Sequence, residues 1–146
     1  MTSDNGQSGD SADVHHSVER WAELMLAAVR APEDPATLGK WARLSCLSIS
    51  TLRARCYAAG VSPKKSLDFA RLLRALAHAP VERCTPTDLL DTKDLRTARA
   101  ILKRAGLSRP QGGDGWPTTT GFLDRQALVT SPGAIAVLRR RLERTA

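Results

Sequence analysis

Hydroxyl and guanidinium side chains gather between residues 48 and 55 of this 146-residue chain, in the sequence SISTLRAR. An arginine can donate two parallel hydrogen bonds to guanine, and a serine or threonine hydroxyl can contact a phosphate or a base edge. A pair of lysines that follows this segment is suited to phosphates. The predicted contacts to a nucleic acid are therefore Ser48, Ser50, Thr51, Arg53, Arg55, Lys64 and Lys65.

The positive charge of the chain is concentrated around these side chains. Residues 40–74 carry eight Lys or Arg against a single carboxylate, Asp68, so this segment alone carries +7, which equals the net charge of the whole chain. Residues 1–39 are acidic, and residues 101–146 are basic. Aromatic residues make up only 4% of the chain, too few for the stacking surface of a single-strand binder. The charge pattern favours a polyanionic partner such as double-stranded DNA.

Two short helices would position these side chains. Asp34 followed by Pro35 predicts a helix over residues 35–44, with the aspartate as N-cap and the proline in the first turn. Ser48 is suited to cap a second helix over residues 49–58.

Leu52 and Cys56 then share the buried face of this second helix, and Gly60 suits the left-handed position that closes it. A short helix that braces a second one, whose N-terminal residues reach base edges in the major groove, is a helix-turn-helix. The sequence predicts this motif at residues 35–58.

The rest of the chain predicts an all-α fold, with further helices on the C-terminal side. A Ser-Pro pair predicts a helix from Pro63 to Pro80, and only residues 121–130 could hold a short strand. The predicted organisation is a disordered acidic tail over residues 1–16, a helical DNA-binding domain over 17–106, a loop over 107–121 and a basic helical segment over 122–146.

Between about Thr37 and Ala77 the residues resemble the DNA-binding domain of the AraC/XylS-type transcription regulators. The family pattern has a helix-turn-helix, a glycine, a linker helix opened by Ser-Pro, and an Arg-Leu-x-x-Ala sequence in that helix. The resemblance covers a little over a quarter of the chain. It implies a DNA-binding regulator of transcription that inserts the helix at 49–58 into the major groove. The matching residues are Leu38, Ala42, Leu47-Ser48, Leu52, Gly60-Val61-Ser62-Pro63, Leu67, Arg71-Leu72 and Ala75.

The chain departs from the family pattern in four places. The recognition helix lies one residue closer to Gly60 than usual, Ser66 replaces the aromatic after the Ser-Pro turn, and Cys56 replaces a phenylalanine. The signature of the second helix-turn-helix is absent after Pro80. A divergent form of that unit could occupy residues 88–106, where nearby aspartates weaken the electrostatics. Its contacts would be Arg96, Thr97, Arg99 and Lys103.

Other chemistries find little support in the sequence. A Gly-rich phosphate loop after a strand, a nucleophile elbow and an HExxH motif are all missing, so we expect neither an enzyme nor a cofactor. Cys46, Cys56 and Cys84 form no CxxC pair, which argues against a metal site and is typical of buried thiols in the cytoplasm. No apolar run approaches the roughly 20 residues that span a membrane.

Two hypotheses about the partner remain open at this point. The first is a cytoplasmic DNA-binding regulator. Because this sequence has no room for the usual sensor domain, either a partner chain brings the signal or the protein is an unregulated binder. A homodimer would gain specificity from paired half-sites. The second is an all-α adaptor that binds an acidic protein through the same basic face. Salt dependence and competition by duplex DNA distinguish the two, since phosphate contacts release counterions.

Overall fold

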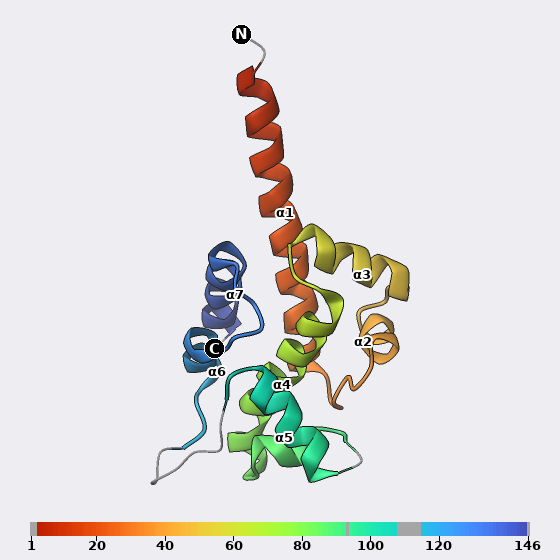
Figure 1. The fold of residues 1–146 in the computed structure, drawn as a ribbon, viewed down its shortest axis with the longest axis vertical. Coiled ribbons are helices and arrows are strands. Elements are labelled where there is room, and N and C mark those ends of the chain that lie inside the picture. Colours follow the sequence, from red (N-terminus) through yellow and green to blue (C-terminus); the bar gives the residue numbers. More distant parts are fainter. Residues whose placement is uncertain (1–2, 93, 108–114, 146) are drawn as a thin grey trace.

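The computed structural model describes residues 3–92, 94–107 and 115–145. All regular elements among these residues are helices and none is a strand, which confirms the all-α fold (Figure 1). The elements are α1 (Ser3–Arg30), α2 (Leu38–Leu44), α3 (Ile49–Ala58), α4 (Pro63–Glu82), the 3₁₀ helix η1 (Pro86–Leu89), α5 (Leu95–Arg104), α6 (Thr119–Arg125) and α7 (Pro132–Thr145).

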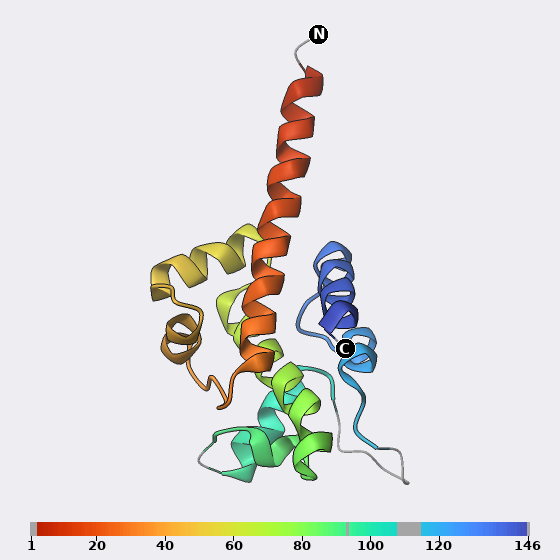
Figure 2. The same ribbon diagram turned by 180° about the vertical axis from the view of Figure 1, so that it is seen from behind.

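Helices α1 and α4 form the centre around which the other elements are arranged. In both views α2 and α3 lie on one side of α1, and α6 and α7 lie on the other (Figures 1 and 2). Helix α5 lies at the end of the molecule opposite the N-terminus of α1. The pair α2–α3 packs against both central helices, whereas α5 packs against η1, which packs on α4, and is joined to α4 by the ion pair between Arg104 and Asp68.

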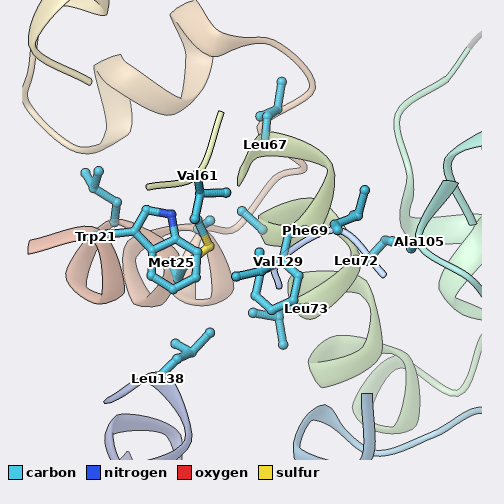
Figure 3. Packing of buried hydrophobic residues seen from close by; sticks show 14 of the residues in the cluster. Trp21, Met25, Val61, Leu67, Phe69, Leu72, Leu73, Ala105, Val129 and Leu138 are labelled. Carbon is cyan, nitrogen blue, oxygen red and sulfur yellow. The ribbon is translucent and has the colours of Figure 1, made fainter. Parts of the chain in front are cut away.

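Three stacked aromatic rings join α1, α4 and α6. The ring centroid of Phe69 lies 6.0 Å from that of Trp21 and 5.2 Å from that of Phe122. All three residues are fully buried, and Figure 3 shows Trp21 and Phe69 among the aliphatic side chains of the core. Because Phe122 belongs to the C-terminal helices, these share one hydrophobic core with the N-terminal ones.

Helix α1 begins earlier than the sequence predicts. Residues 3–16 are helical in the structure, whereas the sequence predicts a disordered tail over residues 1–16, of which the first two lie outside the described residues. Once the packed part of a helix exists, each further residue adds one hydrogen bond without a new nucleation cost. The helix therefore continues through a segment that has little to bury, and Asp13 to His16 are exposed.

Asp34 is not the N-cap that the sequence predicts. Helix α2 begins at Leu38 instead of Pro35, and its N-cap is Thr37, whose side chain accepts a hydrogen bond from the Lys40 N–H at 3.1 Å. The Asp34 carboxylate is buried and forms a bidentate ion pair with Arg71 of α4, with a shortest N–O distance of 2.7 Å. A buried charged partner outcompetes a cap at the surface because it satisfies both oxygens.

Two further predictions need correction. Pro80 does not end α4, which continues to Glu82 and closes at Arg83 with φ of 55°. A proline so near the C-terminus removes only one of the last hydrogen bonds of the helix. Residues 121–130 hold no strand, because Thr118 caps α6 and Phe122 is buried. Within the predicted loop at 107–121, residues 108–114 lie outside the described residues, and α6 begins at Thr119.

Candidate nucleic-acid interface

Helices α2 and α3 form two consecutive helices joined by a four-residue turn, as a helix-turn-helix requires. Trp41 of α2 and Leu52 of α3 are fully buried, and the Trp41 indole donates a hydrogen bond to the Leu24 carbonyl of α1 at 3.0 Å. In the turn, Cys46 has φ of 59°, in the left-handed region, which the sequence does not predict for this residue. The buried faces of α2 and α3 thus leave the opposite face of α3 to solvent.

The predicted bounds of α3 are confirmed, but its predicted contact residues are spread along the helix. Ser48, Ser50 and Thr51 lie at the exposed N-terminal end, Arg53 lies in the middle, and Arg55 lies in the last turn. Ser48 is the N-cap of the helix, accepting from the Thr51 N–H at 3.1 Å and donating to the Thr51 hydroxyl at 2.9 Å. Ser50 and Arg53 are exposed, and Arg55 is partly buried. The exposed hydroxyls of Ser48 and Thr51 therefore bond to each other, and that of Ser48 also caps the helix.

The two predicted lysine contacts lie in the first turn of α4, which is the next element along the chain. Ser62 caps this helix by accepting from the Lys65 N–H at 3.2 Å, with Pro63 in the first turn as the sequence predicts. Lys64 and Lys65 are both exposed. Gly60, between the two helices, has φ of 82° and so occupies the left-handed position predicted for it.

Only part of the +7 of residues 40–74 is available to a partner. Arg71 and Arg74 are buried: the first pairs with Asp34, and the second donates to the carbonyls of Ala31 and Pro32 at 2.9 and 2.8 Å. Lys40 forms an ion pair with Asp91 at 3.7 Å. The remaining five cations make no ion pair with any other described residue: Arg43, Arg53, Arg55, Lys64 and Lys65.

These five cations lie on three consecutive elements: Arg43 on α2, Arg53 and Arg55 on α3, and Lys64 and Lys65 in the first turn of α4. Residues 35–67 contain no Asp or Glu, so no carboxylate of this segment lowers the local positive potential. Arg43 is not among the contacts predicted from the sequence, although it belongs to the same block of charge and is exposed on α2. Its position shortly before the recognition helix is the sequence feature from which this contact could have been predicted.

Helix α5 repeats the N-terminal end of α3. Both helices have ten residues, and a shift of 46 positions relates the N-cap Ser48 to the N-cap Asp94. The Asp94 carboxylate accepts from the Thr97 N–H at 2.8 Å and from the Thr97 hydroxyl at 2.9 Å. Thr51 takes the same two roles in α3, with the hydroxyl bond reversed in direction.

The C-terminal ends of α3 and α5 also match. Gly60 and Gly106 have φ of 82° and 79°. The Val61 N–H donates to the Cys56 carbonyl at 3.1 Å, and the Leu107 N–H donates to the Leu102 carbonyl at 2.9 Å. These are the bonds of a Schellman motif, in which an apolar residue follows the glycine.

The sequence analysis predicts a divergent second unit at residues 88–106 but not the residue-by-residue match between α3 and α5, although the signal of this match is present in the chain. The run Thr51-x-Arg53 ends at Ala59-Gly60, and Thr97-x-Arg99 ends at Ala105-Gly106 with the same spacing. The exchange of serine for aspartate at the N-cap hides it in a comparison by residue type. Because both residues cap a helix equally well, the local structure is kept.

The second predicted contact set lies on the exposed surface of α5. Its four residues, Arg96, Thr97, Arg99 and Lys103, are all exposed. Asp94 remains at the N-terminus of this helix, and hydrogen bonds from the backbone and hydroxyl of Thr97 lower its pKa. The N-terminal end of α5 thus carries a carboxylate where α3 carries a neutral hydroxyl. The preceding element also differs, since η1 is a four-residue 3₁₀ helix.

Basic residues of α7 are partly neutralised by ion pairs. On α7, Arg139 pairs with Asp124, and Arg141 pairs with Glu19 and Glu23 of α1 at 2.9 and 3.4 Å. The prediction that the cysteines are buried holds for Cys56, whose thiol pKa is raised by burial, and is wrong for Cys46, which is exposed in the turn between α2 and α3.

Two other kinds of site are missing from the residues that the structure describes. No three His, Cys, Asp or Glu side chains in this part of the chain are arranged as a metal site. No helix among the same residues has the length and apolar character to cross a membrane. Comparison with protein-family models, curated proteins and solved structures finds no match to this chain.

Proposed function

We propose that this chain is a DNA-binding transcription regulator of AraC-like type that acts in the cytoplasm and inserts α3 into the major groove. The observation that carries the proposal is the charge of α2, α3 and the first turn of α4: five cations there have no ion pair among the described residues, and residues 35–67 contain no carboxylate. The resemblance of residues 37–77 to the AraC/XylS regulators supports the same function.

Different side chains of this segment are suited to different contacts with DNA. Arg53, in the middle of the exposed face of α3, is suited to a guanine edge, and Ser50 and Thr51 are suited to phosphates or base edges. Lys64 and Lys65 contact phosphates from the first turn of α4 in this proposal. Such contacts fix the register of the helix on the duplex without reading its sequence.

We further propose that α5 makes a second, weaker contact with the same duplex. The support is the match of its caps and of Thr97 and Arg99 to their counterparts in α3. The carboxylate of Asp94 opposes phosphate binding at the N-terminus of α5, where the helix dipole would otherwise attract an anion. The α2–α3 unit therefore supplies most of the affinity.

Fluorescence anisotropy of random-sequence duplexes tests this function. We compare the wild type with Arg53→Ala/Arg55→Ala and with the matched control Arg125→Ala/Arg144→Ala, which removes the same charge from exposed sites on α6 and α7. We expect wild-type binding at low salt to fall as salt rises. The first variant binds more weakly, and the slope of log K against log salt decreases by about 0.9 for each phosphate that the variant no longer neutralises.

Two results would contradict the proposal. One is the absence of duplex binding at low salt. The other is an equal weakening in the control variant, because binding would then depend on net charge alone and not on α3. Binding to polyglutamate without binding to DNA would favour the acidic-protein adaptor instead.

A further inference from the structure

Two aliphatic side chains are exposed at the same position of the two matching helices. Ile49 is the first residue of α3 and Leu95 is the first residue of α5, and they are 42% and 53% exposed. Large hydrophobic residues are exposed at only three other described positions, Val14, Tyr57 and Val81. The shift of 46 residues that relates the N-caps also relates Ile49 to Leu95.

Each aliphatic residue is followed four positions later by an exposed arginine. Arg53 follows Ile49 and Arg99 follows Leu95, and residues at this spacing are neighbours on a helix surface. An apolar group and a guanidinium thus stand side by side near the start of each helix. A partner that fits must offer an apolar group beside hydrogen-bond acceptors and negative charge.

Neither side chain is needed to close the core. Leu52 and Cys56 of α3, and Ala98 and Leu102 of α5, form the buried faces of the two helices. Ile49 lies toward α2, where its Cδ1 is 3.7 Å from the position that a Cβ on Gly39 would take. It nevertheless leaves almost half of its surface to solvent, and Leu95 leaves slightly more.

We propose that Ile49 and Leu95 contact thymine 5-methyl groups in the major groove, so that each helix reads a thymine. This inference rests on the DNA-binding function proposed above. The thymine methyl is the apolar group on the major-groove edge of the bases, and it lies among acceptor atoms and close to phosphates. The N-terminal residues of a recognition helix reach base edges, and Ile49 and Leu95 occupy that position. Arg53 beside Ile49 and Arg99 beside Leu95 match the negative charge of DNA, and the carboxylate of Asp94 next to Leu95 makes this match weaker at α5 than at α3.

Replacement of thymine by uracil removes only the methyl group and therefore tests the proposal directly. A duplex is first selected from a random pool by the wild-type protein and is then prepared with thymine or with uracil. Burial of one methyl-sized group corresponds to about a fourfold change in affinity, so two contacts predict about 15-fold weaker binding to the uracil duplex. The measured quantity is the ratio of the two dissociation constants.

The variants assign this ratio to individual side chains. In Ile49→Ala and in Leu95→Ala the thymine preference falls to about fourfold, and in the double variant it disappears. Val14→Ala is the matched control, because Val14 is an exposed aliphatic residue of α1 and should leave the ratio unchanged. Circular dichroism establishes that each variant keeps its helical content.

The outcomes separate this inference from the proposed function. If no duplex is selected at all, the DNA-binding function itself fails. If a duplex binds equally well with thymine and uracil, or if the double variant keeps the preference, the inference is overturned while DNA binding stands. If Leu95→Ala prefers the thymine duplex as strongly as the wild type does, Leu95 does not contact a thymine methyl group. If the wild type self-associates and Ile49→Ala does not, while the ratio of the two dissociation constants is unchanged, Ile49 contacts a second copy of the chain. This result also overturns the inference.

Discussion

Replacement of Asp34 by alanine tests how the connection between α1 and α2 is held against α4 and the segment before α5. The Asp34 and Arg71 side chains are 2% and 7% exposed. The carboxylate accepts from Arg71 Nε at 3.1 Å and Nη2 at 2.7 Å, and its Oδ2 also accepts from the Asp91 N–H at 2.7 Å. Arg71 Nη2 donates in addition to the Asp91 carbonyl at 3.3 Å. The cluster joins the α1–α2 connection, α4 and the segment before α5.

The loss in free energy of unfolding distinguishes the role of Asp34 in the buried ion pair from the N-cap role that the sequence predicts. Loss of an N-cap aspartate costs about 1 kcal/mol. Removal of one partner from a buried ion pair costs about 3–5 kcal/mol, because the other charge stays buried and uncompensated. A domain of ordinary stability unfolds with about 5–15 kcal/mol, so Asp34→Ala should remove a large fraction of the total.

Urea unfolding followed by tryptophan fluorescence measures this free energy, since Trp21 and Trp41 are fully buried. The control is Asp124→Ala, which breaks the exposed pair with Arg139 and should cost less than about 1 kcal/mol. The double variant Asp34→Ala/Arg71→Met should be more stable than Asp34→Ala, because it leaves no uncompensated buried charge at this site. A cost near 1 kcal/mol for Asp34→Ala, or no recovery in the double variant, would refute the reasoning.

Three further changes have outcomes that follow from local geometry. Cys46→Gly should stabilise the fold by roughly 0.5 kcal/mol, because relief of the left-handed strain exceeds the added entropy of the unfolded chain; a lower urea midpoint would contradict this. Leu52→Ala should cost about 2–5 kcal/mol in the same assay, since Leu52 is fully buried, and a cost below about 1 kcal/mol would show that the site is not tightly packed. A hydrogen bond from Arg141 lowers the pKa of Glu19, so the stability from this pair is present above the ordinary value of 4.5 and is lost as pH falls through the lowered value. Glu19→Gln should flatten this acid loss in urea midpoints, and an unchanged pH profile would exclude the pair as its source.

Both ends of α3 and the start of α4 could be predicted because local chemistry determines them. The serine hydroxyl at Ser48 or Ser62 accepts from a backbone N–H three residues ahead and needs no distant residue to do so, and the predicted starts of both helices are confirmed. Gly60 and Gly106 close α3 and α5 because glycine enters the left-handed region at little cost.

Predictions fail where a distant residue competes with a local interaction. The local sequence favours Asp34 as a helix cap, and only the approach of Arg71 from α4 shows why it does not take that role. The positive charge of residues 40–74 suggests a single face, yet Arg71 and Arg74 lie in the interior, where they bond to the segment after α1. Sequence spacing counts charges but does not show which of them are neutralised by residues far along the chain.

By itself, the sequence determined the helical class, the bounds of α3 and the location of the cationic segment, because these depend on caps, periodicity and composition. The tertiary structure decided which five cations stay free of ion pairs among the described residues, and it made visible the match between α3 and α5. It also decided that Cys46 adopts a left-handed conformation. Packing produces these features, since α2 and α3 must both bury their apolar faces against α1 and α4 while the turn between them adapts.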